Sequence, residues 1–331
     1  MTDPDHAVRE AVAALRAGQL IGLPTETVYG LAADARNPQA VARIFAAKGR
    51  PTDHPLIVHL ASADQLDDWA RDIPEAARRL AAAFWPGPLT LILKRQPGVP
   101  DAVTGGQDTV GLRVPAHPVA QAVLSAFGGG LAAPSANRFG RISPTTAAHV
   151  REELGDAVAV VLDGGGCEVG IESTIVDLSR GVPVMLRPGR VSVSELSRVL
   201  GEAVLTPDAP DATTPRVSGA LASHYAPTTP VRLLDAAALP AAAAAAAQAG
   251  QRIGVLSRTL MDDAPAHGSV WLQLPNDPVS YAHRLYRDLR RLDQCGASLL
   301  LIEAPPQSAE WRAVNDRLQR AAADREGLPK P

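Results

Sequence analysis

Short apolar runs alternate with helical segments from residue 7 to about residue 200, and this alternation is the feature that most restricts the fold. Residues 7–17 repeat apolar positions at helical spacing, and residues 19–24 are typical of a short buried strand. Four further helices are expected: one begins near Pro38, one ends at Phe84, one covers 117–127 and one begins at Ser143–Pro144. Strands are expected at 55–60, 89–93, 109–115, 130–134, 157–162, 173–178 and 182–188. The pattern predicts an α/β domain over residues 1–200.

Residues 201–230 break this pattern, because they are rich in Pro, Thr, Ser, Asp and Gly, as an extended linker is. Beyond them the alternation resumes in residues 231–331. Strands are expected at 231–235, 251–257, 269–274 and 297–304, and helices at 236–249, 281–296 and from Gln307. This second α/β unit is Rossmann-like in its element pattern, but no GxGxxG follows its first strand.

Composition excludes several function classes. The 331 residues carry 32 Lys and Arg against 35 Asp and Glu, so no global basic field draws the chain onto nucleic acid or anionic lipid. Cys167 and Cys295 lie far apart without CxxC spacing, which favours two reduced thiols over a disulfide framework or a structural zinc site. The first residues lack a signal-peptide core, so a soluble, cytoplasmic protein is expected.

Six motifs occur in a fixed order within the first domain. They are PTETVYGL at 24–31, KGRPTDHPLIVH at 48–59, TVGLRVP at 109–115, APSANRFGRISPT at 133–145, IESTIVD at 171–177 and LRPG at 186–189. Together they resemble the YrdC/Sua5 family of threonylcarbamoyl-AMP synthases, which act in N6-threonylcarbamoyladenosine formation at position 37 of transfer RNAs. SHYAP at 223–227 and the second α/β unit make the chain similar to the longer, two-domain Sua5 type.

The resemblance implies a fold and a reaction. The fold is a YrdC-like twisted α/β domain with a mixed sheet around a large concave cavity, followed by the linker and the smaller C-terminal domain. The reaction joins L-threonine, bicarbonate or CO2 and ATP to give threonylcarbamoyl-adenylate and pyrophosphate. Mg²⁺ accompanies ATP with no dedicated protein metal site, and the downstream partner is the transferase complex that passes the threonylcarbamoyl group to transfer RNA.

The resemblance also implies roles for single residues. A carboxylate is well held by the two parallel hydrogen bonds of a guanidinium, which suits Arg113 at a strand end. The threonine pocket implied by the family consists of Thr27, His59, Arg113, Ala133 through its backbone, and Ser173. Asn137 and Arg141 are secondary candidates for the pocket.

ATP carries several negative charges, so cations and hydroxyl donors are expected around it. The implied ATP contacts are Lys48, Arg50, His54, Thr109, Ser135, Ser143, Arg187 and Tyr225. Lys48 and Arg50 are the expected catalytic residues, because they can stabilise charge on the phosphates as pyrophosphate leaves. His54 departs from the family, which commonly has Asn there, although a neutral imidazole still donates one hydrogen bond.

Structural roles compete with these functional ones. His59 alone could be a satisfied core histidine, and Arg113 and Arg187 could each cap a sheet edge. Ser143 before Pro144 has the pattern of a helix N-cap. Tyr225 could anchor the linker to a domain surface, or the linker could fold back over the cavity as a lid that brings Tyr225 to the nucleotide.

Two other functions stay open at the level of sequence. A double-stranded RNA-binding module of YrdC-like fold would bind weakly through a locally basic concave surface, with a steep salt dependence. A carbamoyl-adenylate enzyme of the hydrogenase-maturation type would need zinc-finger CxxC pairs, which the chain lacks.

Overall fold

The computed structural model describes residues 4–207, 213–219, 221, 223–259 and 269–323, and its chain divides into two compact units. The first comprises residues 1–139 and 144–220, and the second comprises residues 140–143 and 221–331. The chain therefore passes between the units inside the predicted 201–230 linker, of which residues 208–212, 220 and 222 lie outside the described residues. Among the described helices, none is long and apolar enough to cross a membrane.

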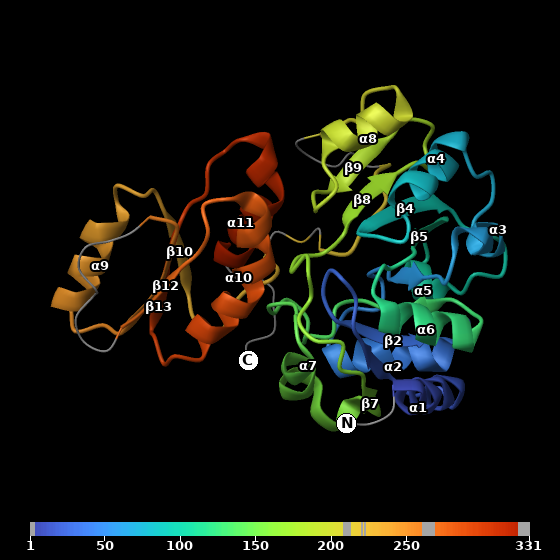
Figure 1. Ribbon diagram of the computed structural model, residues 1–331, viewed down its shortest axis with the longest axis horizontal. Helices are drawn as coiled ribbons and strands as arrows, with labels where there is room; N and C mark the ends of the chain where they lie inside the picture. The colour runs from blue at the N-terminus through green and yellow to red at the C-terminus, as the bar shows by residue number, and fades with distance from the viewer. Residues whose placement is uncertain (1–3, 208–212, 220, 222, 260–268, 324–331) are drawn as a thin grey trace. The chain divides into compact units, whose positions relative to one another are not determined.

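A nine-stranded mixed sheet forms the centre of the first unit, in the order β7-β1-β2-β6-β3-β5-β4-β8-β9 (Figure 1). Its strands are β1 (Ile21–Leu23), β2 (Gly30–Asp34), β3 (Ile57–His59), β4 (Leu89–Lys94), β5 (Thr109–Arg113), β6 (Leu131–Ala132), β7 (Val160–Val161), β8 (Thr174–Asp177) and β9 (Val184–Arg187). The helices are α1 (Pro4–Arg16), α2 (Pro38–Lys48), α3 (Leu66–Trp69), α4 (Glu75–Phe84), α5 (Asp101–Thr104), α6 (Pro118–Phe127), α7 (Ala147–Leu154) and α8 (Val193–Leu200).

Helix α2 places two of the motif residues. Asn37 caps its N-terminus by accepting hydrogen bonds from the backbone N–H groups of residues 39 and 40, and Pro38 occupies the first turn. The helix ends at Gly49, whose left-handed backbone (φ 60°) is the usual helix stop. Lys48 is therefore the last helical residue, and Arg50 follows one residue after the stop.

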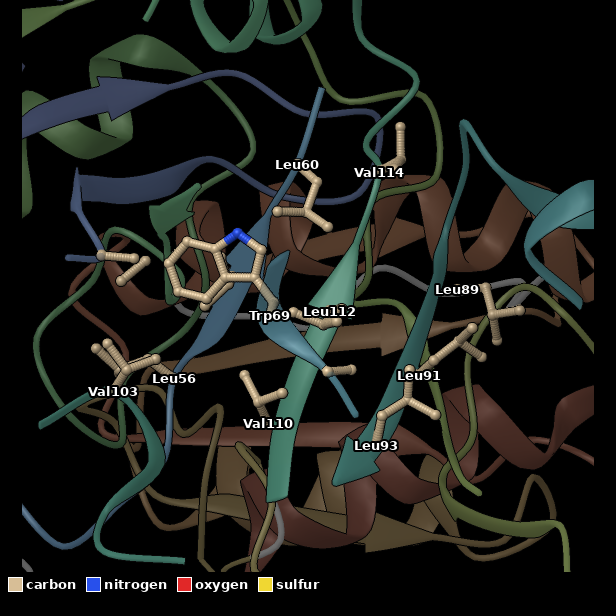
Figure 2. Close-up of a cluster of buried hydrophobic side chains, with 14 of the residues drawn as sticks. Leu56, Leu60, Trp69, Leu89, Leu91, Leu93, Val103, Val110, Leu112 and Val114 are labelled. Atoms are coloured by element: carbon tan, nitrogen blue, oxygen red, sulfur yellow. The ribbon is translucent and has the colours of Figure 1, made fainter. Parts of the chain in front are cut away.

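One face of the sheet carries the main apolar core. Val110, Leu112 and Val114 alternate along β5 and its extension, and they pack in this core with Leu89, Leu91 and Leu93 of β4 (Figure 2). The residues between them point to the opposite face, since side chains alternate along a strand. That opposite face bears Thr109, Gly111 and Arg113 of β5 and is named the site face below.

Four isoleucine and valine side chains form a smaller apolar cluster on the site face. Ile57, Ile92 and Ile175 come from β3, β4 and β8, and Val217 comes from the segment after the predicted domain end. Residues 215–218, named the strap below, thus pack on the site face of the first unit. Arg216 fixes the strap by donating through Nη2 to the carbonyl oxygen of Gly105 (2.8 Å).

The second unit has a four-stranded sheet in the order β10-β13-β11-β12, and all its strand pairs are parallel. Its elements, orange to red in Figure 1, are β10 (Val231–Leu234), α9 (Leu239–Gln248), β11 (Ile253–Ser257), β12 (Val270–Gln273), α10 (Pro278–Asp293), β13 (Leu299–Glu303) and α11 (Arg312–Ala322). Every strand and helix predicted in this unit is present. Residues 260–268 and 324–331 of the predicted domain lie outside the described residues.

One expectation about local structure was wrong, and helices α5 and α8 and strand β2 were not predicted. Strand β2 was not predicted, because its sequence GLAAD is short and built mainly of small residues. The helix expected to open at Ser143–Pro144 begins at Ala147, with Thr146 as the N-cap that accepts from the His149 N–H. The chain stays extended until then because the carbonyl oxygens of Pro144 and Thr145 accept from Tyr29 and Cys167.

Candidate active site

Arg113 is the centre of one half of the site face. It lies at the end of β5, beside His59 at the end of the parallel strand β3, with which it is in register. Only 4% of Arg113 is exposed. Its Nε donates to the carbonyl oxygen of Gly87 (3.2 Å), its Nη1 to Thr27 Oγ1 (2.8 Å) and its Nη2 to Glu26 Oε1 (2.6 Å). The side chain is therefore held in one orientation, which excludes the solvated sheet-edge alternative.

Thr27 has one hydrogen-bonding function to spare. Thr25 Oγ1 donates its only hydroxyl hydrogen to the carbonyl oxygen of Val28 (2.6 Å). The 2.9 Å contact between the hydroxyls of Thr25 and Thr27 must therefore use the hydrogen of Thr27. Thr27 Oγ1 also accepts from Arg113, so as far as the described residues show, one of its two lone pairs is left for a ligand that donates.

His59 completes this half as a neutral side chain. It is 3% exposed, and its Nδ1 lies 3.4 Å from the carbonyl oxygen of Ile57. Burial, reinforced by the positive charge of Arg113, lowers the pKa of His59 to about 3. At neutral pH the ring is therefore uncharged and can donate or accept one hydrogen bond without adding to the charge of the pocket.

Ser173 and Arg187 link this half of the site to the strap. Ser173 Oγ lies 2.8 Å from Thr90 Oγ1 and accepts from Arg187 Nη2 at 3.1 Å. The Nε of Arg187 donates to the Ser173 carbonyl oxygen at 3.0 Å, and its Nη1 donates to the Ser218 carbonyl oxygen at 2.9 Å. Arg187 is thus an interior residue, 4% exposed, rather than an edge cap.

Lys48 is a buried amine, 3% exposed, that lies among carbonyl oxygens. Its Nζ donates to the carbonyl oxygens of Ser135 (2.6 Å) and Asn137 (2.5 Å). Burial, with a smaller contribution from the positive Arg50, lowers the pKa of Lys48 well below its usual value. An anion close to Nζ would reverse this shift, so the amine is suited to meet a phosphate.

Arg50 and His54 both contact the ring of Phe139, and Arg50 also contacts the strap. The Arg50 guanidinium carbon lies 5.7 Å from the ring centroid of Phe139, and His54 meets the same ring edge-on at 5.4 Å. Arg50 Nη2 donates to the Pro55 carbonyl oxygen (3.0 Å) and to Ser218 Oγ (3.2 Å). Burial and then the Arg50 charge lower the pKa of His54, so its ring also favours the neutral form.

Thr109 lies at the opposite end of β5 from Arg113, four residues and about 13 Å away along the strand. It lines a small pocket, partly open to solvent, together with residues of the strap and of the 55–57 segment. The site face therefore has one polar group of residues around Arg113 and another around Arg50, with the pocket beside the latter.

Ala133 is 6% exposed and follows β6. Its N–H donates to the Ile57 carbonyl oxygen (3.0 Å), so the amide is already used and only the carbonyl of Ala133 could serve a ligand. Asn137, a secondary candidate, is 1% exposed and contributes its carbonyl oxygen to Lys48.

Three predicted residues belong to the second unit. Ser143 is fully buried there, and Arg141, a secondary candidate, donates to Thr228 Oγ1 (3.1 Å). Tyr225 is 1% exposed and stacks on Tyr286 with ring centroids 5.8 Å apart. The backbone of Tyr225 is left-handed (φ 61°), which is costly for a bulky residue and is characteristic of functional positions. The binding roles of these residues stay predictions.

Sequence reasoning missed two residues of the site. Glu26 contacts Arg113, and Ser218 contacts both Arg50 and Arg187. Glu26 lies inside the PTETVYGL motif, and its place in that motif was the only available signal, because its pairing with the buried Arg113 spans 87 residues. No local pattern marks Ser218, which becomes part of the site only because the strap returns to the sheet.

Comparisons with known proteins find relatives that match both parts of the chain. Residues 13–189 match the Sua5–YciO–YrdC family, described as "Telomere recombination", and residues 191–323 match "Threonylcarbamoyl-AMP synthase, C-terminal domain". Threonylcarbamoyl-AMP synthase of Pyrococcus abyssi is 38% identical over 326 residues, covering 96% of this chain and 94% of that protein. The Bacillus subtilis protein of the same name is 38% identical over 331 residues, covering 97% and 94%.

The solved structure of P. abyssi Sua5 complexed with L-threonine superimposes with a TM-score of 0.89 at 38% identity. The match covers 95% of this chain and 94% of that one. It therefore includes both units of the chain, which confirms the expected α/β domain followed by a smaller α/β domain.

Proposed function

The chain belongs to the Sua5–YciO–YrdC family, in the form with the Sua5-type C-terminal domain, and from this premise we propose that it synthesises threonylcarbamoyl-AMP. The substrates are L-threonine, bicarbonate or CO2, and ATP, and the products are threonylcarbamoyl-AMP and pyrophosphate. This assignment makes the chain a nucleotidyltransferase. Its product supplies the transferase complex that forms N6-threonylcarbamoyladenosine at position 37 of transfer RNA.

The observation that supports this most strongly is the set of hydrogen-bonding groups left at Arg113 and Thr27. Three of the five guanidinium N–H groups of Arg113 are used within the described residues, which leaves two. A carboxylate takes two parallel N–H bonds. The remaining lone pair of Thr27 accepts from a hydroxyl or an amine, so the pair matches an α-amino acid with a hydroxyl side chain.

Carbamate formation precedes adenylation in this scheme. The threonine ammonium group first loses a proton to water, and the neutral amine attacks the carbon of CO2. As the N–C bond forms, the nitrogen releases a second proton to water, which leaves a carbamate. A carbamate oxygen then attacks the α-phosphorus of ATP while the bond between that phosphorus and the α–β bridging oxygen breaks, releasing pyrophosphate. Neutral His59 and the fixed Arg113 orient the amino acid, so that catalysis rests on positioning.

The cations of the other half would bind the nucleotide. We place the phosphates among Lys48, Arg50 and Arg187, with the hydroxyl of Thr109 and the 133–135 segment nearby, because the positive groups of the site face gather there. Ser135, Ser143, His54 and Tyr225 complete the proposed ATP contacts. Positive charge around the phosphates stabilises the departing pyrophosphate.

Mg²⁺ enters this proposal as part of the ATP complex. Among the described residues no three His, Cys, Asp or Glu side chains gather where they could hold a metal ion. The hydroxyls and cations of the site are instead suited to bind the phosphate oxygens of ATP. Phosphate oxygens and water would in turn be the oxygen ligands of Mg²⁺, which prefers such ligands. Bound in that way, the ion would neutralise charge on the phosphates. The two free cysteines suit the cytoplasmic location included in the proposal.

The test is an incubation of the full chain with ATP, Mg²⁺ and bicarbonate, with and without L-threonine. Pyrophosphate release that depends on threonine, together with the adenylate mass in a mass spectrum, is the expected result. If threonine leaves the rate unchanged, the proposal is wrong. A salt titration of double-stranded RNA binding would then test the alternative binding role, with a steep log–log slope expected for phosphate contacts.

A further inference from the structure

Glu26 forms a buried ion pair on the site face. Its Oε1 lies 2.6 Å from Arg113 Nη2, and 7% and 5% of the two side chains are exposed. Its other oxygen, Oε2, accepts from the backbone N–H of Ala116 at 3.0 Å. One carboxylate therefore ties the turn of PTETVYGL both to the end of β5 and to the chain that follows it.

Only a carboxylate satisfies both contacts of Glu26. Arg113 and the Ala116 N–H are both donors, so both oxygens at this position have to accept. A glutamine of the same length would turn its amino group toward one of these donors and lose that hydrogen bond. A buried arginine that loses its partner is strongly destabilised and rotates toward any other acceptor within reach.

Rotation of Arg113 would redirect the two N–H groups that remain for a ligand. We propose that Glu26 is the positioning residue of the threonine site, which sets the guanidinium plane so that these two N–H groups face the substrate carboxylate. This inference rests on the proposed function. Glu26 does not touch the substrate in this scheme and acts through Arg113, while Thr27 from the same turn fixes the other terminal nitrogen.

The charge of Glu26 and its orienting effect on Arg113 act on threonine binding in opposite directions. Glu26 neutralises Arg113, and His59 is neutral, so these three side chains together bring no net charge to the substrate carboxylate. Removal of the Glu26 charge would strengthen the pull of Arg113 on any carboxylate, whereas removal of the tether would misplace its donors. The proposal holds that orientation dominates, because a bidentate contact requires both N–H groups to be aligned at once.

The experiment compares Glu26→Gln with the unaltered chain in threonine-dependent pyrophosphate release. The expected result is a KM for L-threonine raised tenfold or more, with the KM for ATP changed less than twofold. A second readout is the ratio of kcat/KM for L-threonine to that for L-threoninamide, which lacks the carboxylate. This ratio should fall at least fivefold in the variant, whereas a general loss of structure would lower both rates and leave the ratio unchanged.

Glu303→Gln is the matched control. Glu303 forms a buried ion pair with Arg258 at the same 2.6 Å distance, within the sheet of the second unit. The same isosteric change there should lower stability without altering the threonine to threoninamide ratio.

Coupling to Arg113 is measured with Arg113→Lys and the double variant, in which Glu26→Gln should have little further effect on the ratio. An unchanged or lower KM for threonine in Glu26→Gln, or an unchanged ratio, would overturn the proposal. If the unaltered chain shows no threonine-dependent release, the proposed function fails instead, so the two failures are distinguishable.

Discussion

The protonation of His59 gives the sharpest test of the electrostatics of the site. The ring is buried beside Arg113, and its pKa is lowered to about 3 by burial first and by the arginine charge second. In the unfolded chain a histidine titrates near pH 6.5. We therefore predict that His59 stays neutral from pH 8 down to pH 5 in the folded protein, and that this neutrality costs stability as the pH falls.

The sign and size of this effect follow from linkage. Between pH 6.5 and pH 3 the unfolded state binds a proton at this position and the folded state does not, so stability rises with pH across that window. At pH 5.5 the unfolded histidine is about ten to one protonated, which favours unfolding by about 1.4 kcal/mol relative to pH 8. Acidification to pH 5.5 should thus lower the unfolding free energy of the first unit by about that amount through His59 alone.

The assay measures urea unfolding of the unaltered chain and of His59→Gln at pH 8 and at pH 5.5. Since other titrating groups are common to both proteins, the difference between their pH effects isolates His59. His6→Gln on the exposed first turn of α1 is the control and should behave as the unaltered chain. Proton NMR should also show that one of the eight histidines does not titrate above pH 5. The signal of this histidine is assigned to His59 because it is missing from the spectrum of His59→Gln. A His59 signal with a midpoint between 6 and 7, or equal pH effects in both proteins, would refute the reasoning.

Three further predictions concern the nucleotide half. Lys48→Met should reduce the rate of pyrophosphate release by about 100-fold or more, because phosphate charge loses its cation, while circular dichroism stays unchanged; activity within threefold would contradict the assigned role. Ser218→Ala removes a hydroxyl acceptor that competes with ATP for Arg50, but it keeps the backbone carbonyl oxygen that is bound to Arg187. The KM for ATP should therefore fall, by up to about tenfold for one charged hydrogen bond. A higher KM would mean that Ser218 assists ATP binding instead. Tyr225→Phe keeps the stacked ring in place and should raise the KM for ATP severalfold. The unfolding free energy should change by less than about 1 kcal/mol. An unchanged KM would show that the Tyr225 hydroxyl does not contribute to ATP binding.

The elements that the sequence predicted well are those with a strong apolar pattern. Strands β4 and β5 bury alternate apolar residues, and helix α2 carries an Asn cap, a Pro in its first turn and a Gly stop. Strand β2 escaped prediction because its small residues have no strand preference, so that its place between β1 and β6 depends on pairing with segments distant in the chain. The start of α7 was misplaced because a Ser–Pro cap signal is local, whereas the extended conformation there depends on tertiary hydrogen bonds to Tyr29 and Cys167.

The site was predictable where a motif ends a strand and not where distant segments meet. Arg113 and His59 were expected to be functional from their motifs, and the parallel pairing of β3 with β5 then places them side by side. The partner of Arg113 was not foreseen, since Glu26 lies 87 residues earlier in the chain. The contact of Ser218 with Arg50 spans 168 residues and exists only in the folded chain.

The two faces of β5 separate stability from chemistry within one strand. Val110 and Leu112 hold the core, while Thr109 and Arg113 on the opposite face serve the two halves of the site. Gly111 lies between them on the site face, where a Cβ would come within 3.1 Å of Ile92 Cδ1 and would press on the apolar cluster beneath Val217 of the strap. Glycine weakens a strand interior, and its presence here is explained by the close approach of the Ile92, Ile57 and Thr90 side chains from the neighbouring strands. Under the proposed function, the same five residues would position the amino-acid site at one end of the strand and the nucleotide site at the other, while their alternate side chains pack in the core.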